Sequence, residues 1–183
     1  MQSTTTLSER LKLYTQPEHQ ETEKLLINRI KSVRSNEDYI ELLKIFYGYF
    51  APLETLVRQH LTSKDLPDLH ERRSAVRIEE DLKALGYQET LTLSTSLPQI
   101  ENKHDAAGAM YVQEGSTLGG RHIARMISGK IDCQDAFSFF EGYNEKTDQM
   151  WDNFKSYLNQ NVTTESEAIQ VMDGAKQTFA KMK

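Results

Sequence analysis

Apolar residues recur along much of this chain at intervals of three and four, the spacing that places side chains on one face of an α-helix. Leu26, Ile30 and Val33 share one such stripe. A second helix is expected to begin at Asn36, and Pro52 inside it is expected to kink it. Its predicted inward-facing residues are Tyr39, Leu42, Leu43, Phe46, Tyr47, Phe50, Leu53 and Val57.

Residue types that begin or end helices divide the chain further. The stretch "TQPE" has the form of a capping box, with Thr15 as the N-cap and Glu18 reaching back to it. The stretch "ERRSAVRIEEDLKALG", residues 71–86, predicts a third helix that ends at Gly86. Residues 88–98 alternate as a strand would. A lone short strand has no partner, so an extended connection is expected there.

The rest of the chain is also predicted to be helical. One helix is expected from about Asn102 to Ser128, ended by Gly129, and a short turn is expected at residues 137–140. Two more helices follow, "NEKTDQMWDNFKSYLNQ" with Asn144 as cap and "TTESEAIQVMDGAKQTFAKM" capped by Thr163 or Thr164. The sequence therefore predicts an all-α fold of about seven helices and no sheet, in a single domain spanning residues 1–183.

Three glycines interrupt the helix that begins near Asn102. Gly115, Gly119 and Gly120 lie in "GSTLGG", where alanine would stabilise a helix by roughly 1 kcal/mol per position. The segment is not a phosphate-binding loop, because it lacks the G-x-x-x-x-G-K pattern and a preceding strand. Three uses remain: close packing of another helix, a kink, or backbone brought against a flat ligand.

Composition narrows the classes of function. The 183 residues are 38% hydrophobic and 27% charged, enough for one sizeable core. The net charge of −5 disfavours a nucleic-acid partner. No apolar run approaches the ~20 residues that span a membrane, and the N-terminus lacks the apolar core of a signal peptide. The single cysteine, Cys133, cannot form an internal disulfide, so a cytoplasmic location is expected.

His19 is the histidine with the best local setting for a ligand. It lies just after Thr15, and Glu23 lies four residues further on the same helical face. A metal-bound histidine usually has its second ring nitrogen tied to a carboxylate, carbonyl or water, although an exposed pair has the same spacing. The "ENKH" of residues 101–104 has one E-x-x-H pattern, but a di-iron site needs two. Ser116 has no histidine at a recognisable local spacing.

Taken together, these stretches resemble the haem oxygenase family over most of the chain. "LKLYTQPEH" resembles the family's opening L-K-x-x-T-x-x-x-H, and "YVQEGSTLGG" is similar to the bacterial distal-helix motif Y-V-x-E-G-S-x-L-G-G. "RRSAVRIEEDLKALG", "FFEGYNEKTDQMWDNF" and "AIQVMDGAKQTF" resemble their family counterparts in order and spacing. The resemblance implies a haem oxygenase-like helical bundle in which the distal helix kinks over haem.

The resemblance also implies roles for residues. His19 would be the axial ligand of the haem iron, with Glu23 as its nearby carboxylate. Gly115, Gly119 and Gly120 would bring backbone over the opposite haem face, where oxygen binds. Ser116 stands where animal-type enzymes carry an aspartate that organises the water for proton delivery; bacterial relatives also lack it. The remaining expected haem-binding residues, at the propionate edge, are Lys12, Lys155 and Tyr111.

The implied reaction opens haem, as both substrate and cofactor, with O2. The products would be biliverdin, carbon monoxide and iron, and an external reductase or ferredoxin would supply electrons. The reaction would serve iron acquisition, through the released iron, or would supply biliverdin to a light-sensing partner such as a bacteriophytochrome. Two alternatives stay open: a non-catalytic haem-binding or storage protein of the same fold, and a related helical enzyme acting on a small organic substrate. A helical interaction module would leave the three glycines unexplained.

Overall fold

The computed structural model describes residues 5–132 and 135–182. Seven helices of 8 residues or more make up most of this part. They are α1 (Leu7–Tyr14), α2 (Gln16–Ser32), α3 (Asn36–His60), α4 (Val76–Ala84), α5 (Lys103–Ser128), α7 (Thr147–Asn161) and α8 (Glu165–Lys181). Shorter turns are α6 (Ser138–Glu141) and the 3-10 turns η1 (Leu69–Glu71) and η2 (Asn144–Lys146). The described residues hold no strand, so the all-α prediction is confirmed.

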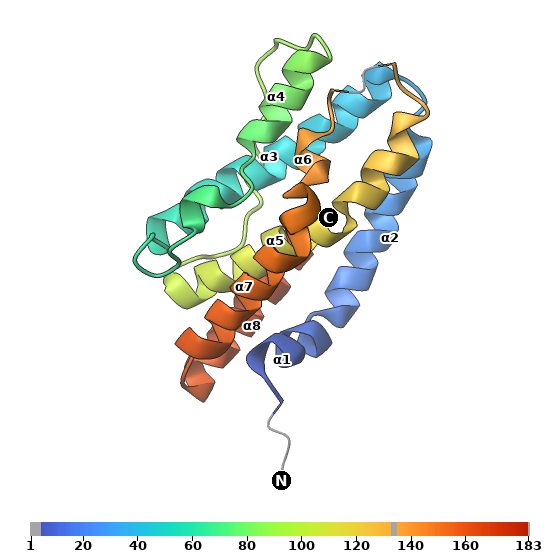
Figure 1. The fold of residues 1–183 in the computed structure, drawn as a ribbon. Helices are drawn as coiled ribbons and strands as arrows, with labels where there is room; N and C mark the ends of the chain where they lie inside the picture. Colours follow the sequence, from blue (N-terminus) through green and yellow to red (C-terminus); the bar gives the residue numbers. More distant parts are fainter. Residues whose placement is uncertain (1–4, 133–134, 183) are drawn as a thin grey trace.

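Helix α5 runs through the middle of the bundle and changes direction along its length (Figure 1). Its predicted bounds are confirmed. The side chain of Asn102 accepts hydrogen bonds from the backbone N–H groups of His104 and Asp105, and Gly129 follows the last helical residue. α5 contacts α3, α6, α7 and α8, and α2 also packs along it. The helix that carries the glycine segment is therefore the one around which the others are arranged.

Helices α5 and α8 approach each other closely. A Cβ atom on Gly108 of α5 would overlap the carbonyl oxygen of Val171 on α8. A Cβ on Gly174 of α8 would lie 2.7 Å from the carbonyl oxygen of Asp105 on α5. Because neither glycine has a side chain, the two backbones come into direct contact, which fixes α8 against α5.

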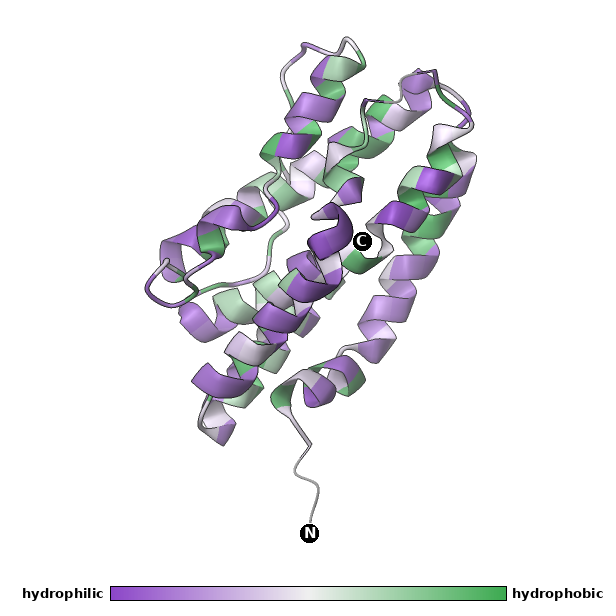
Figure 2. Cartoon of the chain, viewed as in Figure 1, coloured by the Kyte–Doolittle hydropathy of each residue, from purple (hydrophilic) through white to green (hydrophobic). Residues whose placement is uncertain are grey.

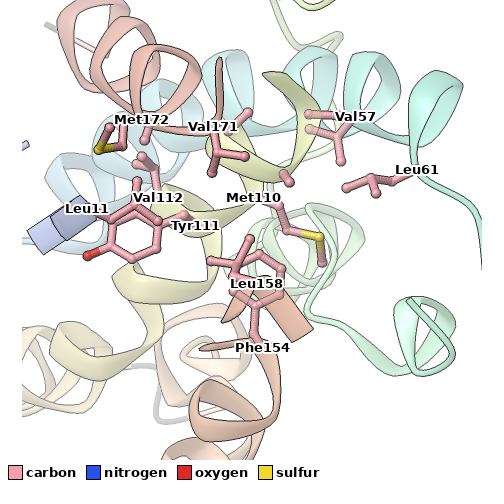
Figure 3. Close-up of a cluster of buried hydrophobic side chains, with 14 of the residues drawn as sticks. Leu11, Val57, Leu61, Met110, Tyr111, Val112, Phe154, Leu158, Val171 and Met172 are labelled. Carbon is pink, nitrogen blue, oxygen red and sulfur yellow. The ribbon is translucent and has the colours of Figure 1, made fainter. Parts of the chain in front are cut away.

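Two clusters of buried side chains form the core. The first joins α1, α3, α5, α7 and α8, and Figure 3 shows part of it, including Leu11, Met110, Phe154 and Leu158. The second joins the first half of α3 to α4, α6 and the end of α5. The apolar faces of the helices point inward, whereas α2 is largely hydrophilic (Figure 2). Within the described residues, no helix combines the length and the apolar character needed to cross a bilayer.

Some predicted helix ends are confirmed. α3 begins at Asn36, and Gly86 adopts a φ of 81° just after α4. Thr164 forms a capping box with Glu167 at the start of α8. The segment of residues 88–98 is a connection without helix or strand, as predicted. One hydrogen bond joins it to α3: the N–H of Ser94 donates to the carbonyl of Gly48 at 2.8 Å.

Three predicted details at helix ends were wrong. Thr15 is the N-cap residue of α2, as predicted, but it forms no capping box with Glu18, because its hydroxyl donates to the carbonyl of Leu11 at 2.8 Å. The third helix begins at Val76 and not near residue 71, because the arginines before it turn inward. Asn144 lies in the turn η2 with a φ of 53°, and α7 begins at Thr147.

Candidate functional site

His19 lies in the first turn of α2 with its imidazole exposed. Its ring meets the ring of Phe179 on α8 edge-on, with centroids 5.3 Å apart and planes at 78°. Glu23 is also exposed, one turn further along α2. Among the described residues, no hydrogen bond reaches either ring nitrogen of His19. The imidazole therefore has an aromatic neighbour, and neither of its nitrogens is hydrogen-bonded within the described residues.

The three glycines of α5 have different surroundings. A Cβ on Gly119 would have no atom within 4 Å, and a Cβ on Gly115 would meet only the Trp151 ring, at 3.7 Å. A Cβ on Gly120 would overlap the carbonyl oxygen of Phe140 on α6. Gly120 is therefore required for helix packing. Gly119 leaves bare backbone beside open space, and Gly115, one turn earlier on the same face of α5, leaves bare backbone beside the Trp151 ring.

Ser116 points away from that open face. Its Oγ accepts a hydrogen bond from Nη2 of Arg73 at 2.5 Å and donates to the carbonyl of Gln113 at 2.7 Å. The Arg73 guanidinium also donates to the Gln113 carbonyl at 2.9 Å and lies 4.1 Å above the Phe139 ring. Both hydrogen-bonding roles of the Ser116 hydroxyl are taken by protein groups, so it supports α5 from behind.

A buried ion pair lies next to Gly115. Glu114 is 2% exposed, and its carboxylate meets Nη1 of Arg72, which is 4% exposed, at 2.7 Å. The hydroxyl of Tyr143 donates to the same carboxylate, at 2.9 Å from one oxygen, and accepts from the backbone N–H of Arg73 at 2.6 Å. Arg72 is in turn held by both carboxylate oxygens of Asp68. The network fixes the residue before Gly115 to two other segments, residues 68–73 and the turn at Tyr143.

Burial dominates the electrostatics of this network. It raises the pKa of the Glu114 carboxyl, against the opposing effect of Arg72. It lowers the pKa of Arg73 to about 10, and it raises the pKa of the Tyr143 hydroxyl. Charges in a poorly solvated site are costly unless they are paired and hydrogen-bonded, as they are here.

Trp151 of α7 forms one wall near Gly115. Its ring lies 5.2 Å from that of Tyr111, and Nζ of Lys155 lies 5.8 Å from its centroid. Tyr111 is buried, its pKa is raised by burial, and Figure 3 shows its hydroxyl pointing away from the other labelled core side chains. Lys155 is already paired with Asp152 at 2.8 Å. Lys12, in the last turn of α1, is exposed.

Sequence reasoning missed several of these residues. Arg72, Arg73, Glu114 and Tyr143 all lie in stretches that carry the family resemblance, and a glutamate amid the apolar residues of α5 was the available signal. Nothing in the local spacing indicated that Phe179 would meet His19.

Two other polar places lie apart from the predicted site residues. An open hollow of about 850 Å³ beside the second half of α5 is lined mainly by Arg121, Arg125, Glu141, Glu145 and Lys146, and none of the predicted site residues lines it. His104 of the "ENKH" stretch bonds Gln170, with Nδ1 3.1 Å from its amide oxygen. The described residues contain no group of three or more metal-ligating side chains.

Known proteins resemble this chain in sequence and in fold. The family model described as "Heme oxygenase" matches residues 5–183. A heme oxygenase of Xanthomonas campestris pv. campestris (strain 8004) is 27% identical over 146 residues, which cover 79% of this chain and 86% of that protein. The crystal structure of the NO- and CO-bound heme oxygenase of Neisseria meningitidis aligns with a TM-score of 0.78 and 22% identity, over 97% of this chain and 88% of that chain, and so shares its fold. The chain therefore belongs to the heme oxygenase family, and is a haem-binding enzyme of that class.

Proposed function

We propose that this enzyme opens haem oxidatively to biliverdin, with release of carbon monoxide and iron, and that His19 is the axial ligand of the haem iron. The observation that carries the proposal is a pair of features on neighbouring helices. α2 presents an imidazole whose nitrogens form no hydrogen bond within the described residues, and α5, which packs along it, presents bare backbone at Gly115 and Gly119. A flat ligand with one metal centre fits an imidazole on one side and glycine backbone on the other.

His19 would bind iron through Nε2 in its neutral form. The edge of Phe179 sets the plane of the ring. Nδ1–H then needs an acceptor, because a ligating imidazole with a tied second nitrogen is held in one tautomer and is a stronger ligand. Glu23, one turn along α2, supplies that acceptor directly or through a water.

Haem would supply the redox chemistry, and the protein would control space and protons around it. Gly115 and Gly119 keep side chains out of the oxygen-binding side. Ser116 takes no direct part in proton delivery in this proposal, because Arg73 and the Gln113 carbonyl engage its hydroxyl. Its role is to hold the glycine segment in place. Water would be held by hydrogen bonds to the backbone of Gly115 and Gly119. That water would then carry protons to the oxygen-binding side of haem.

The propionate edge would be served first by Lys12, which is exposed and has no ion-pair partner among the described residues. Lys155 would have to leave Asp152 to reach a propionate. Tyr111 would act through its ring, which supports Trp151. The same proposal includes Gly120, although its effect on haem would be indirect, through the packing of α5 on α6.

The test is reconstitution with haemin followed by turnover. The wild-type complex is expected to show a Soret band that disappears under oxygen with ascorbate or a reductase, while biliverdin absorbance appears. His19→Ala should lose the imidazole-bound spectrum. A wild-type Soret band that persists under turnover conditions would favour the storage alternative. Unchanged haemin affinity and spectrum in His19→Ala would contradict the assigned ligand.

Electrons would come from an external reductase or ferredoxin, with O2 as the oxidant. We further propose a cytoplasmic location and transfer of biliverdin to a bacteriophytochrome. Co-purification of the chain with such a photoreceptor, and chromophore loading in its presence, would test that last step.

A further inference from the structure

Three side chains spaced four residues apart fasten the His19 region to α8. Tyr14, at the end of α1, donates from its hydroxyl to Oδ1 of Asp173 at 2.6 Å. Glu18 of α2 pairs with Lys176 at 3.5 Å. Thr22 donates to the carbonyl of Phe179 at 3.3 Å. The α8 partners are spaced three apart, so both sets lie on single helical faces. We call these three pairs the α2–α8 latch.

Glu18 is the least expected member of the latch. Its side chain is only 18% exposed, and among the described residues its Oε2 is buried without a hydrogen-bond partner. Lys176 is 46% exposed and also lies 5.2 Å above the ring of Tyr14. An ion pair with one partner so exposed contributes little to stability. A poorly solvated carboxylate at this position therefore calls for an explanation other than stability.

The latch acts where α2 has few other constraints. Only Thr22 and Ile30 are buried within α2, and Leu26 packs half-buried against the second core cluster, so the apolar contacts of this helix lie beyond Thr22 and not in the turn that carries His19. Side chains project outward from the helix axis. A small rotation of α2 about its axis therefore moves the His19 side chain sideways. His19 follows Glu18 directly and precedes Thr22 by one turn, which places it between two points of attachment.

α8 is a suitable reference for this alignment. It is fixed on α5 by the direct backbone contact at Gly108 and Gly174. Phe179 supplies both the carbonyl that binds Thr22 and the ring that meets His19. Because α8 contacts both α5 and α2, it sets the position of His19 relative to the glycines of α5.

We infer that Tyr14, Glu18, Asp173 and Lys176 are positioning residues that set the orientation of the His19 imidazole toward the haem iron. The inference rests on the proposed role of His19 as axial ligand. The four residues touch neither haem nor the reacting atoms. They act by holding α2 in one rotational orientation relative to α8. Replacing them should therefore change the geometry and strength of the iron–imidazole bond.

The experiment compares Glu18→Gln, Lys176→Gln and the double variant, each loaded with haemin. The iron–imidazole stretching band of the ferrous complex is read by resonance Raman, and the haemin dissociation constant by titration. Each single variant is expected to shift or broaden the band and to weaken haemin binding by about 10-fold, the low end of the effect of residues that orient a metal ligand. The double variant should resemble the singles, because either change breaks the same pair.

Arg10→Gln is the matched control. Arg10 of α1 forms a two-point ion pair with Glu165 at the start of α8, so it ties α1, and not α2, to α8. It should leave the band and the affinity unchanged. Tyr14→Phe removes one hydroxyl from the latch. It replaces Glu18→Gln as the latch variant if Glu18→Gln does not fold.

The outcomes separate the two proposals. Wild-type band and affinity in the latch variants, with both lost in His19→Ala, would overturn the latch and leave the ligand assignment intact. An equal effect of Arg10→Gln would also overturn it, because general tethering would then explain the result. A wild-type band in His19→Ala would instead refute the proposed ligand.

Discussion

Gly120 lies so close to the carbonyl group of Phe140 that no side chain fits between α5 and α6. The neighbouring Gly119 faces open space. Gly120 is thus required for helix packing, whereas Gly119 leaves the proposed ligand side of the helix open. Substitutions at the two positions should have opposite signatures.

Gly120→Ala should destabilise the fold. The added methyl group would overlap main-chain atoms of Phe140, which cannot rotate away as a side chain can. Overpacking of this kind costs about 1–3 kcal/mol in the free energy of unfolding. Urea denaturation would measure it, with Gly119→Ala as control. The control should be more stable than wild type by roughly 1 kcal/mol through helix propensity. Equal effects at both positions would contradict the packing argument.

Gly119→Leu should fold, bind haemin and lose turnover. The leucine side chain would project from the open face of α5 into the region assigned to oxygen. Haemin binding through His19 should persist as a Soret band, whereas biliverdin absorbance should not appear under oxygen and reductant. Normal biliverdin production by this variant would rule out the proposed geometry of the oxygen side.

Arg72→Met should cost about 3–5 kcal/mol in the free energy of unfolding, because it leaves the buried Glu114 carboxylate without its cation. Adding Glu114→Leu to the same chain should recover much of the loss, since no charge is then buried. Chemical denaturation of the two single variants and the double variant would form the double-mutant cycle. Additive losses would show that the two residues do not depend on one another.

The start of α8 should weaken in acid. Glu167 accepts from the backbone N–H groups of Thr163 and Thr164, which lowers its pKa to about 2 from an ordinary value of 4.5. A carboxylate whose pKa is lowered on folding stabilises the fold above the unfolded pKa. That contribution is lost as pH falls through 4.5 toward 2.

Unfolding free energies of wild type and Glu167→Gln should therefore differ near neutral pH and converge toward pH 2. A difference independent of pH would contradict this account. Thr164→Ala, which removes the other half of the capping box, should cost roughly 0.5–2 kcal/mol.

Much of the helix pattern was predictable because its signals are local. Asn102 and Gly129 define the ends of α5, and Gly86 follows α4, through backbone preferences that depend on a few neighbouring residues. The same local reasoning predicted a capping box at Thr15 that does not form. It could not detect that α1 runs on into α2 with only a slight interruption.

The start of α4 illustrates a different limit. The helical pattern of residues 71–86 is genuine, but Arg72 is drawn to Glu114, 42 positions away, before the helix begins. Burying an ion pair requires partners from both segments, and no local preference encodes that choice.

By itself, the sequence determined the all-α class, most helix boundaries and the family motifs around His19 and the three glycines. The tertiary structure alone decided that Gly120 serves packing while Gly115 and Gly119 face outward, that Ser116 is engaged by Arg73, and that α8 holds α2. The physical reason is range. Helix formation and capping depend on groups within about one turn, whereas the bond from Thr22 to Phe179 joins residues 157 positions apart.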